Sequence, residues 1–243
     1  GDYTIYYYVK GDDNHSDTEV ASITSTIKKV APTVTAPTPK TLNYNGSAQI
    51  LANSGTTKGG TLYYSLSATG SWSTTLPKGT DAGDYTIYYY VKGDDNHTDT
   101  EVASIVSTIK KVAPTVTAPT GKTLNYTGSA QALATAGSAS GGTLYYSLSS
   151  SGSWQTTIPN GTNVGSYTIY YYVKGDANHT DTEVASVVSA INKVAPTLTA
   201  PTPKTLTYNG SAQILANAGT ATGGTLYYGL SASGPWTTTI PSG

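Results

Sequence analysis

The sequence contains no cysteine, no methionine, no phenylalanine and no arginine. Without cysteine the chain forms no disulfides, no zinc–thiolate sites and no thiol nucleophiles. Without cysteine and methionine it also offers little that oxidants attack, which suits an extracellular location or one at a cell surface. These absences exclude thiol chemistry and lead us to expect an exposed, extracellular protein.

Strong charge and long apolar runs are missing as well. Thirteen basic residues stand against fourteen acidic ones, for a net charge of −1. Nucleic-acid binding needs a cationic footprint that releases counterions, and arginine is the usual bidentate ligand for phosphate. No apolar run approaches the length of a membrane-spanning helix. We therefore expect no nucleic-acid partner and no membrane insertion within these residues.

The residues that are abundant favour strands and turns. The sequence has 21 tyrosines and three tryptophans as its aromatic residues, 26 glycines, and only 11% charged residues. Aromatic and β-branched residues favour strands, and glycine favours turns. This composition predicts an all-β protein.

A long internal repeat runs through the chain. Trp72, Trp154 and Trp236 recur at a constant interval of 82 positions, and His15 recurs at the same interval as His97 and His179. A fixed period of this kind is the signature of a repeat architecture. It predicts two complete repeats, 29–110 and 111–192. Residues 1–28 would form the last two strands of a split repeat, and residues 193–243 the N-terminal part of another.

Each repeat has the pattern of a β-sandwich. Three prolines within residues 29–39 predict an interdomain joint that leads into an edge strand, because proline cannot donate to a central ladder. About seven short strands follow, separated by Gly, Pro and Asn turns. In the third strand Leu62, Tyr64 and Leu66 share one face, which we expect to be buried. Joined by proline-stiffened links, such units would form an extended rod.

The period-two alternation also assigns the inward face of the last two strands. Comparison of the copies places one set of small or apolar positions toward the core. In repeat 29–110 this set comprises Tyr85, Ile87, Tyr89, Val91, Ala103, Ile105, Ser107 and Ile109.

A corner motif precedes the tyrosine-rich strand. Asp81, Gly83 and Tyr85 have the pattern Asp-x-Gly-x-Tyr, and Gly165 and Tyr167 repeat it. The motif resembles the tyrosine corner of immunoglobulin-like domains, in which the hydroxyl bonds to upstream backbone. Ile87 stands where antibody domains have cysteine, so the resemblance is to members without a disulfide.

The whole unit resembles the tandem bacterial immunoglobulin-like repeats of large cell-surface and adhesin proteins. The matching segments are 42–49, 60–65 and 83–85. The resemblance covers the entire chain and implies an extracellular stalk or adhesin repeat. Fold alone does not assign the function.

Polar residues gather in the last hairpin loop. Asp94, Asp95, Asn96 and Asp99 are oxygen ligands of the kind that bind Ca²⁺. The alternative is a solvated polar loop, since Ala177 replaces the second aspartate in the next copy. His97 in the same loop is expected to be a lone exposed residue without a metal or catalytic role. No nucleophile motif or phosphate-binding loop is present, so we expect neither an enzyme nor a bound cofactor.

Two further hypotheses concern covalent and contact chemistry. Lys40, Asn96 and Glu101 provide the residue types of a Lys–Asn isopeptide bond, as found in related surface sandwiches. The competing interpretation is that Lys40 lies exposed in the joint.

Tyrosines outside the inward set would form one face in each repeat. This face either strengthens the sheet or contacts a host glycan or protein. That face comprises Tyr63, Tyr88, Tyr90, Tyr145, Tyr170 and Tyr172.

Three functions follow from this reading. The first is a structural spacer or stalk that projects a distal activity and contacts neighbouring repeats of its own or an adjacent chain. The second is a filament in which the split terminal repeats complete one another head to tail. The plainer alternative for the split repeats is that these residues are a window cut from a longer chain. The third is adhesion to a glycan or protein through the tyrosine face.

Overall fold

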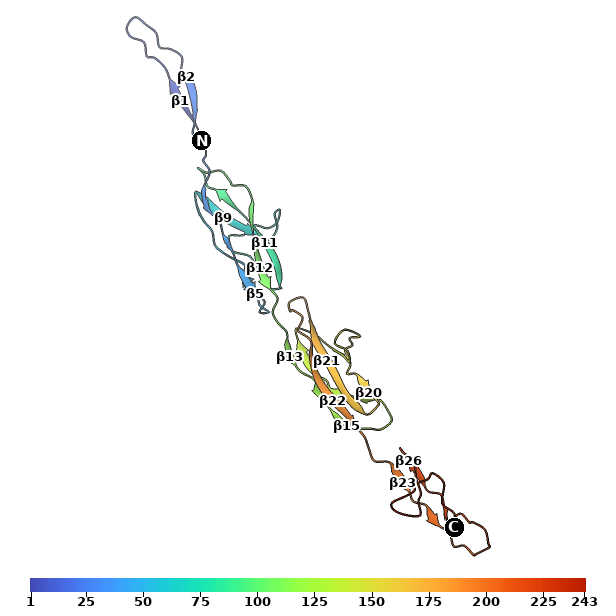
Figure 1. The fold of residues 1–243 in the computed structure, drawn as a ribbon. Helices are drawn as coiled ribbons and strands as arrows, with labels where there is room; N and C mark the ends of the chain where they lie inside the picture. Colours follow the sequence, from blue (N-terminus) through green and yellow to red (C-terminus); the bar gives the residue numbers. More distant parts are fainter. The chain divides into compact units, whose positions relative to one another are not determined.

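The computed structural model describes all residues from 1 to 243, and every regular element in it is a β-strand (Figure 1). No helix in it is long and apolar enough to cross a membrane. The protein is an all-β chain of tandem β-sandwich repeats, as the composition and period predict.

The chain divides into two compact units, which are described separately. The first contains residues 1–117, 138–145 and 172–184, and the second contains residues 118–137, 146–171 and 185–243. This division passes through repeat 111–192, so the repeat boundaries drawn from the sequence stay a prediction. The loop end of that repeat belongs to the same unit as the whole of repeat 29–110.

One sheet of repeat 29–110 has four strands. Its order is β5 (Thr41–Asn43), β12 (Ala103–Lys110), β11 (Gly83–Gly93) and β9 (Gly60–Ser65). β11 pairs antiparallel with both β9 and β12, whereas β5 runs parallel to β12. The neighbouring strands β9, β11 and β12 have the order of one sheet of an immunoglobulin-like sandwich.

The opposite sheet consists of short antiparallel pairs. β3 (Thr33–Thr35) pairs with β8 (Thr56–Lys58), β4 (Thr38–Pro39) with β7 (Ala52–Asn53), and β6 (Gln49–Ile50) with β10 (Lys78–Gly79). Pro37 separates β3 from β4, and Leu51 separates β6 from β7. The Leu51 amide donates to the Pro77 carbonyl, while its own carbonyl accepts from Lys40. The repeat therefore has ten strands rather than the seven expected. The number is higher because β3 and β4, like β6 and β7, are short neighbouring strands that pair with different partners.

The core lies between these two sheets. Leu51, Leu62, Tyr64, Ile87, Val91 and Ile109 are buried together. The predicted inward face is confirmed for Ile87, Val91, Ser107 and Ile109, and Tyr85, Tyr89 and Ile105 are half-buried against the core. Ala103 is exposed at the start of β12. The expectation for Leu66 is wrong: it is 46% exposed, because β9 ends at Ser65 and the alternation stops there.

Repeat 111–192 has the same ten strands. Its four-stranded sheet has the order β15-β22-β21-β19, and its short pairs are β13–β18, β14–β17 and β16–β20. The bounds are β13 Thr115–Thr117, β14 Thr120–Gly121, β15 Thr123–Asn125, β16 Gln131–Ala132, β17 Ala134–Thr135, β18 Ser138–Ser140, β19 Gly142–Ser147, β20 Asn160–Gly161, β21 Gly165–Gly175 and β22 Ala185–Asn192.

The two remaining segments contain parts of this pattern. Residues 1–28 form a hairpin of β1 (Asp2–Tyr7) and β2 (Ala21–Thr26), in which every strand residue is exposed. In residues 193–243, β23 (Thr197–Thr199) pairs with β26 (Thr220–Thr222) and β24 (Thr202–Pro203) with β25 (Ala216–Asn217). Each segment therefore lacks the strands that the other contains.

Candidate functional site

The corner before β11 is held by its tyrosine. The Tyr85 hydroxyl donates to the Asp81 carbonyl oxygen at 2.8 Å, and Tyr167 makes the equivalent bond to Asn163 at 2.6 Å. This is the hydrogen bond that defines a tyrosine corner. The ring lies against β10, where a Cβ on Gly79 would stand 2.6 Å from the ring carbon that bears the hydroxyl. The corner is thus a rigid support at one end of each complete repeat.

The hairpin loop at the other end is ordered by an aspartate and a histidine. The Asp176 carboxylate accepts from the Asn178 amide at 2.8 Å and hydrogen-bonds His179 Nδ1 at 2.7 Å. The hydrogen bond from His179, and then that from the Asn178 amide, lower the pKa of Asp176 below its ordinary value. Asp12 and Asp94 make the same bonds to His15 and His97.

Two of the three histidines, His97 and His179, are not the exposed lone residues that the sequence suggested. The His97 and His179 side chains are only 25% and 18% exposed, whereas that of His15 is 77% exposed. The His179 ring covers Gly141, where an added Cβ would meet the ring at 2.6 Å. Glycine is required there both for this approach and for the backbone φ of 91°.

This loop reaches the corner of the preceding repeat. Asn178 Oδ1 accepts from the Ala82 amide at 2.7 Å, and Asn178 Nδ2 donates to the Asp81 carboxylate at 3.1 Å. Beside them, the rings of Tyr44 and His179 meet edge to face, with centroids 5.4 Å apart. All five residues lie in the first compact unit. We call this set of contacts the joint latch.

The linker between the two repeats is bonded to the same loop. The Val112 amide donates to the Asn178 carbonyl, and the Thr180 amide donates to the Val112 carbonyl. Lys111 Nζ donates to the Asp176 carbonyl at 3.1 Å. The loop Asp176–His179 therefore contacts both the linker and the corner of the preceding repeat.

The residues proposed for calcium form no common ligand set. The carboxylates of Asp94 and Asp99 each accept hydrogen bonds within their own loop, from Asn96 and His97 and from Gly93 respectively. No three Asp, Glu or His side chains converge anywhere in the chain. These side chains stabilise the loop itself.

The structure does not bring together the residues of the isopeptide hypothesis. The Lys40 carbonyl accepts from Thr108, whereas Asn96 lies in the loop before β12 begins at Ala103. Five strand residues span about 17 Å, which exceeds the reach of a lysine side chain. Asn96 and Glu101 are also exposed.

The tyrosine face is partly assembled. Tyr63 and Tyr90 are opposite each other on β9 and β11 and stack with centroids 5.7 Å apart, as do Tyr145 and Tyr172. Trp72, which the sequence did not place here, meets Tyr90 edge to face at 4.7 Å. Tyr88 lies opposite Ser65, and Tyr170 opposite Ser186. The rings are half-buried against one another, which is the geometry of a cross-strand pair that strengthens a sheet.

Sequence reasoning missed the joint latch. Tyr44 belongs to the matching segment 42–49, and Asn178 is the counterpart of Asn96 in the next repeat, but no motif pairs either residue with a neighbouring repeat. The available signal was recurrence: Asp, Asn and His occupy the same loop positions in all three copies, and Tyr44 recurs as Tyr126 and Tyr208.

Comparison with models of known protein families and with curated proteins gives no match. Among solved structures, the chain is similar to the crystal structure of Drosophila N-cadherin EC1-3, with 10% sequence identity and a TM-score of 0.28. The match covers 69% of this chain and 69% of that one. Because so low a score carries no argument, the fold assignment rests on the strand pairing described above.

Proposed function

We propose that this chain is a series of structural spacer repeats of an extracellular bacterial surface protein or fibre, with a mechanical rather than a catalytic role. The observation that carries the proposal is the joint latch, in which Asn178 bonds to both Asp81 and Ala82 of the preceding repeat. A spacer must transmit position from one domain to the next, which requires joints that resist bending. The extracellular location is supported by the lack of cysteine and methionine.

The latch combines three kinds of restraint. The Asn178 side chain fixes the corner, the Tyr44–His179 contact adds apolar area, and the linker is bonded to the loop that carries both. Proline in the linker further limits the backbone conformations available. Together these restraints favour one relative orientation of successive repeats, as a semi-rigid spacer requires.

The experiment compares Asn178→Ala with Asn96→Ala in the full chain. Asn96 occupies the equivalent loop position but is exposed, so its replacement is the matched control. Small-angle scattering and single-particle images would give the distribution of interdomain angles. We expect a narrow distribution for the parent and the control, and a broader one for Asn178→Ala. A broad distribution in the parent would contradict the spacer function.

A further inference from the structure

One turn beside the joint latch contains a reactive pair of residues. Asn45 and Gly46 lie in the turn between β5 and β6, and Asn45 is exposed. The Asn45 side-chain oxygen accepts a hydrogen bond from the Ser47 amide at 2.9 Å, which folds the side chain back over the backbone that follows it. Gly46 has a backbone φ of 77°. This turn therefore holds the side-chain carbonyl carbon of Asn45 close to the Gly46 backbone nitrogen.

The Gly46 nitrogen is free to react. It lies in no strand and donates no hydrogen bond. Glycine has no Cβ to obstruct the approach, and its wide range of backbone angles lets the turn close into a ring. The hydrogen bond from the Ser47 amide also draws electron density from the Asn45 carbonyl, which makes its carbon more electrophilic. Reacting groups held this close within one chain behave as if they were highly concentrated.

We propose that Asn45 is a site of spontaneous deamidation, and that the reaction weakens the joint latch as the protein ages. The Gly46 nitrogen attacks the side-chain carbonyl carbon of Asn45, and the new C–N bond closes a succinimide ring. The bond to the side-chain nitrogen breaks, and that nitrogen leaves as ammonia with the proton from Gly46. Water then opens the ring at either carbonyl and gives aspartate or isoaspartate. Isoaspartate adds one carbon atom to the backbone.

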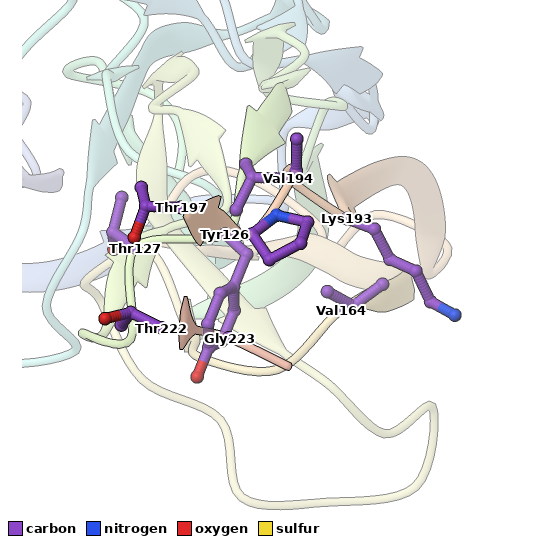
Figure 2. A pocket seen from close by; sticks show the side chains of 10 residues that line it. Tyr126, Thr127, Val164, Lys193, Val194, Thr197, Thr222 and Gly223 are labelled. Carbon is purple, nitrogen blue, oxygen red and sulfur yellow. The ribbon is translucent and has the colours of Figure 1, made fainter. Parts of the chain in front are cut away.

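The other two copies of this turn provide comparisons within the chain. Asn209 and Gly210 repeat it, with a φ of 76° at the glycine. Thr127 occupies the position in repeat 111–192, and its hydroxyl accepts a hydrogen bond from the Ser129 amide at 3.3 Å. Figure 2 shows Thr127 and the preceding Tyr126 among the side chains that line a pocket. Threonine therefore preserves the turn but has no amide group to lose.

A third Asn-Gly pair has the same sequence but a different structure. Asn160 and Gly161 form β20, which pairs with β16, and Gly161 is buried. A Cβ on Gly161 would stand 2.8 Å from the Leu133 side chain and 2.9 Å from the Tyr167 ring. Because this glycine is paired and tightly packed, ring closure at Asn160 requires the strand to open first. The structure therefore distinguishes Asn45 from Asn160, which the dipeptide sequence does not.

The reactive turn adjoins the joint latch. Tyr44 precedes Asn45 in the chain and packs edge to face on His179. The Tyr44 hydroxyl lies 3.9 Å from the position of a Cβ on Gly46, so its side chain passes over the turn. An added backbone atom and a new carboxylate in this turn would displace the Tyr44 ring from His179. The effect on the latch, unlike the modification itself, rests on the spacer function proposed above.

Peptide mass spectrometry of the incubated full chain tests the modification. Cleavage after lysine places Asn45, Asn160 and Asn209 on separate peptides, 41–58, 123–174 and 205–243. One sample is incubated folded in mildly alkaline buffer and a second is incubated in urea. Conversion is read as the mass gain when a carboxyl replaces the amide. In the folded chain we expect Asn45 to convert at least about tenfold faster than Asn160, whereas in urea their rates should be similar.

The matched control is Asn45→Thr, which introduces the residue that the next repeat has at this position. Its peptide 41–58 should show no mass gain at position 45. Equal rates at Asn45 and Asn160 in the folded chain would overturn the proposal. So would an Asn45 that converts in urea and stays unchanged in the folded chain.

Small-angle scattering before and after incubation tests the effect on the joint. We expect the distribution of interdomain angles to broaden for the parent in step with conversion at Asn45, and to stay unchanged for Asn45→Thr. Conversion without broadening would overturn the weakening of the latch and leave the modification site intact. A parent that is already broad before incubation would contradict the spacer function, and the weakening with it, without altering the peptide result.

Discussion

At the scale of single residues, the tyrosine corner makes a measurable contribution to stability. Tyr85→Phe removes only the hydroxyl that donates to the Asp81 carbonyl. A hydrogen bond of this kind contributes about 1 kcal/mol net. We expect the free energy of unfolding in urea, followed by tryptophan fluorescence, to fall by about that amount. The control is Tyr88→Phe on the opposite face of β11, and equal losses in the two variants would contradict a special role for Tyr85.

The aspartate of the loop should make stability depend on pH. Because hydrogen bonding to His179 and to the Asn178 amide lowers the pKa of Asp176 below 3.8 in the folded chain, this carboxylate stabilises the fold at pH values above 3.8. The contribution is lost as the pH falls through the lowered folded-state pKa. Thermal unfolding from pH 7 to pH 2 should therefore show Asp176→Asn less stable than the parent at pH 7, with the difference vanishing in acid.

The control for this measurement is Asp95→Asn, in the equivalent loop of the preceding repeat. Asp95 is exposed and is not the aspartate that bonds the histidine. Its replacement should leave the unfolding temperature close to that of the parent throughout the pH range. A difference for Asp176→Asn that persists unchanged at the lowest pH would show that ionisation of this carboxyl is not the cause.

At the scale of the elements, one buried serine connects the two sheets. Ser107 on β12 donates to the Leu51 carbonyl at 2.7 Å and accepts from the Lys40 amide at 3.2 Å. Ser107→Ala removes both bonds, but Lys40 and Leu51 still bond to each other, so no backbone group is left without a partner. We expect a loss of about 1 kcal/mol in unfolding free energy. Ser104→Ala, exposed on the same strand, should cost close to nothing.

The tyrosine face is best explained at this same scale, as packing between neighbouring strands. Because Tyr63 stacks on Tyr90 and Trp72 packs on Tyr90 from the side, the rings already bury part of each other. Tyrosine tolerates water at its hydroxyl while its ring strengthens pairing between β9 and β11. Adhesion through this face remains a prediction from the sequence.

At the scale of the whole molecule, the latch should couple the stabilities of neighbouring repeats. In repeat proteins the total stability is approximately a sum of intrinsic terms and nearest-neighbour interface terms. Asn178→Ala removes two hydrogen bonds between repeats, a loss of about 1 to 2 kcal/mol from the interface. Calorimetry should show the main transition broaden or separate into two. For Asn96→Ala it should be unchanged, and a similar response in both variants would contradict coupling through the latch.

The sequence by itself determined the repeat period, the all-β class and the identity of the inward residues on β11 and β12, apart from Ala103, which is exposed at the start of β12. These features are local: alternation at period two and turn chemistry act between residues close in the chain. The tyrosine corner belongs to the same class, because Tyr85 bonds a carbonyl only four residues upstream. Prediction failed at Leu66, where the end of β9 interrupts the alternation.

Only the tertiary structure decided which loops and corners meet. Asn178 and Asp81 are 97 positions apart, and nothing in the spacing of either motif indicates that they bond. The contact depends on how two folded repeats pack, as does the separation of Lys40 from Asn96 along the sandwich.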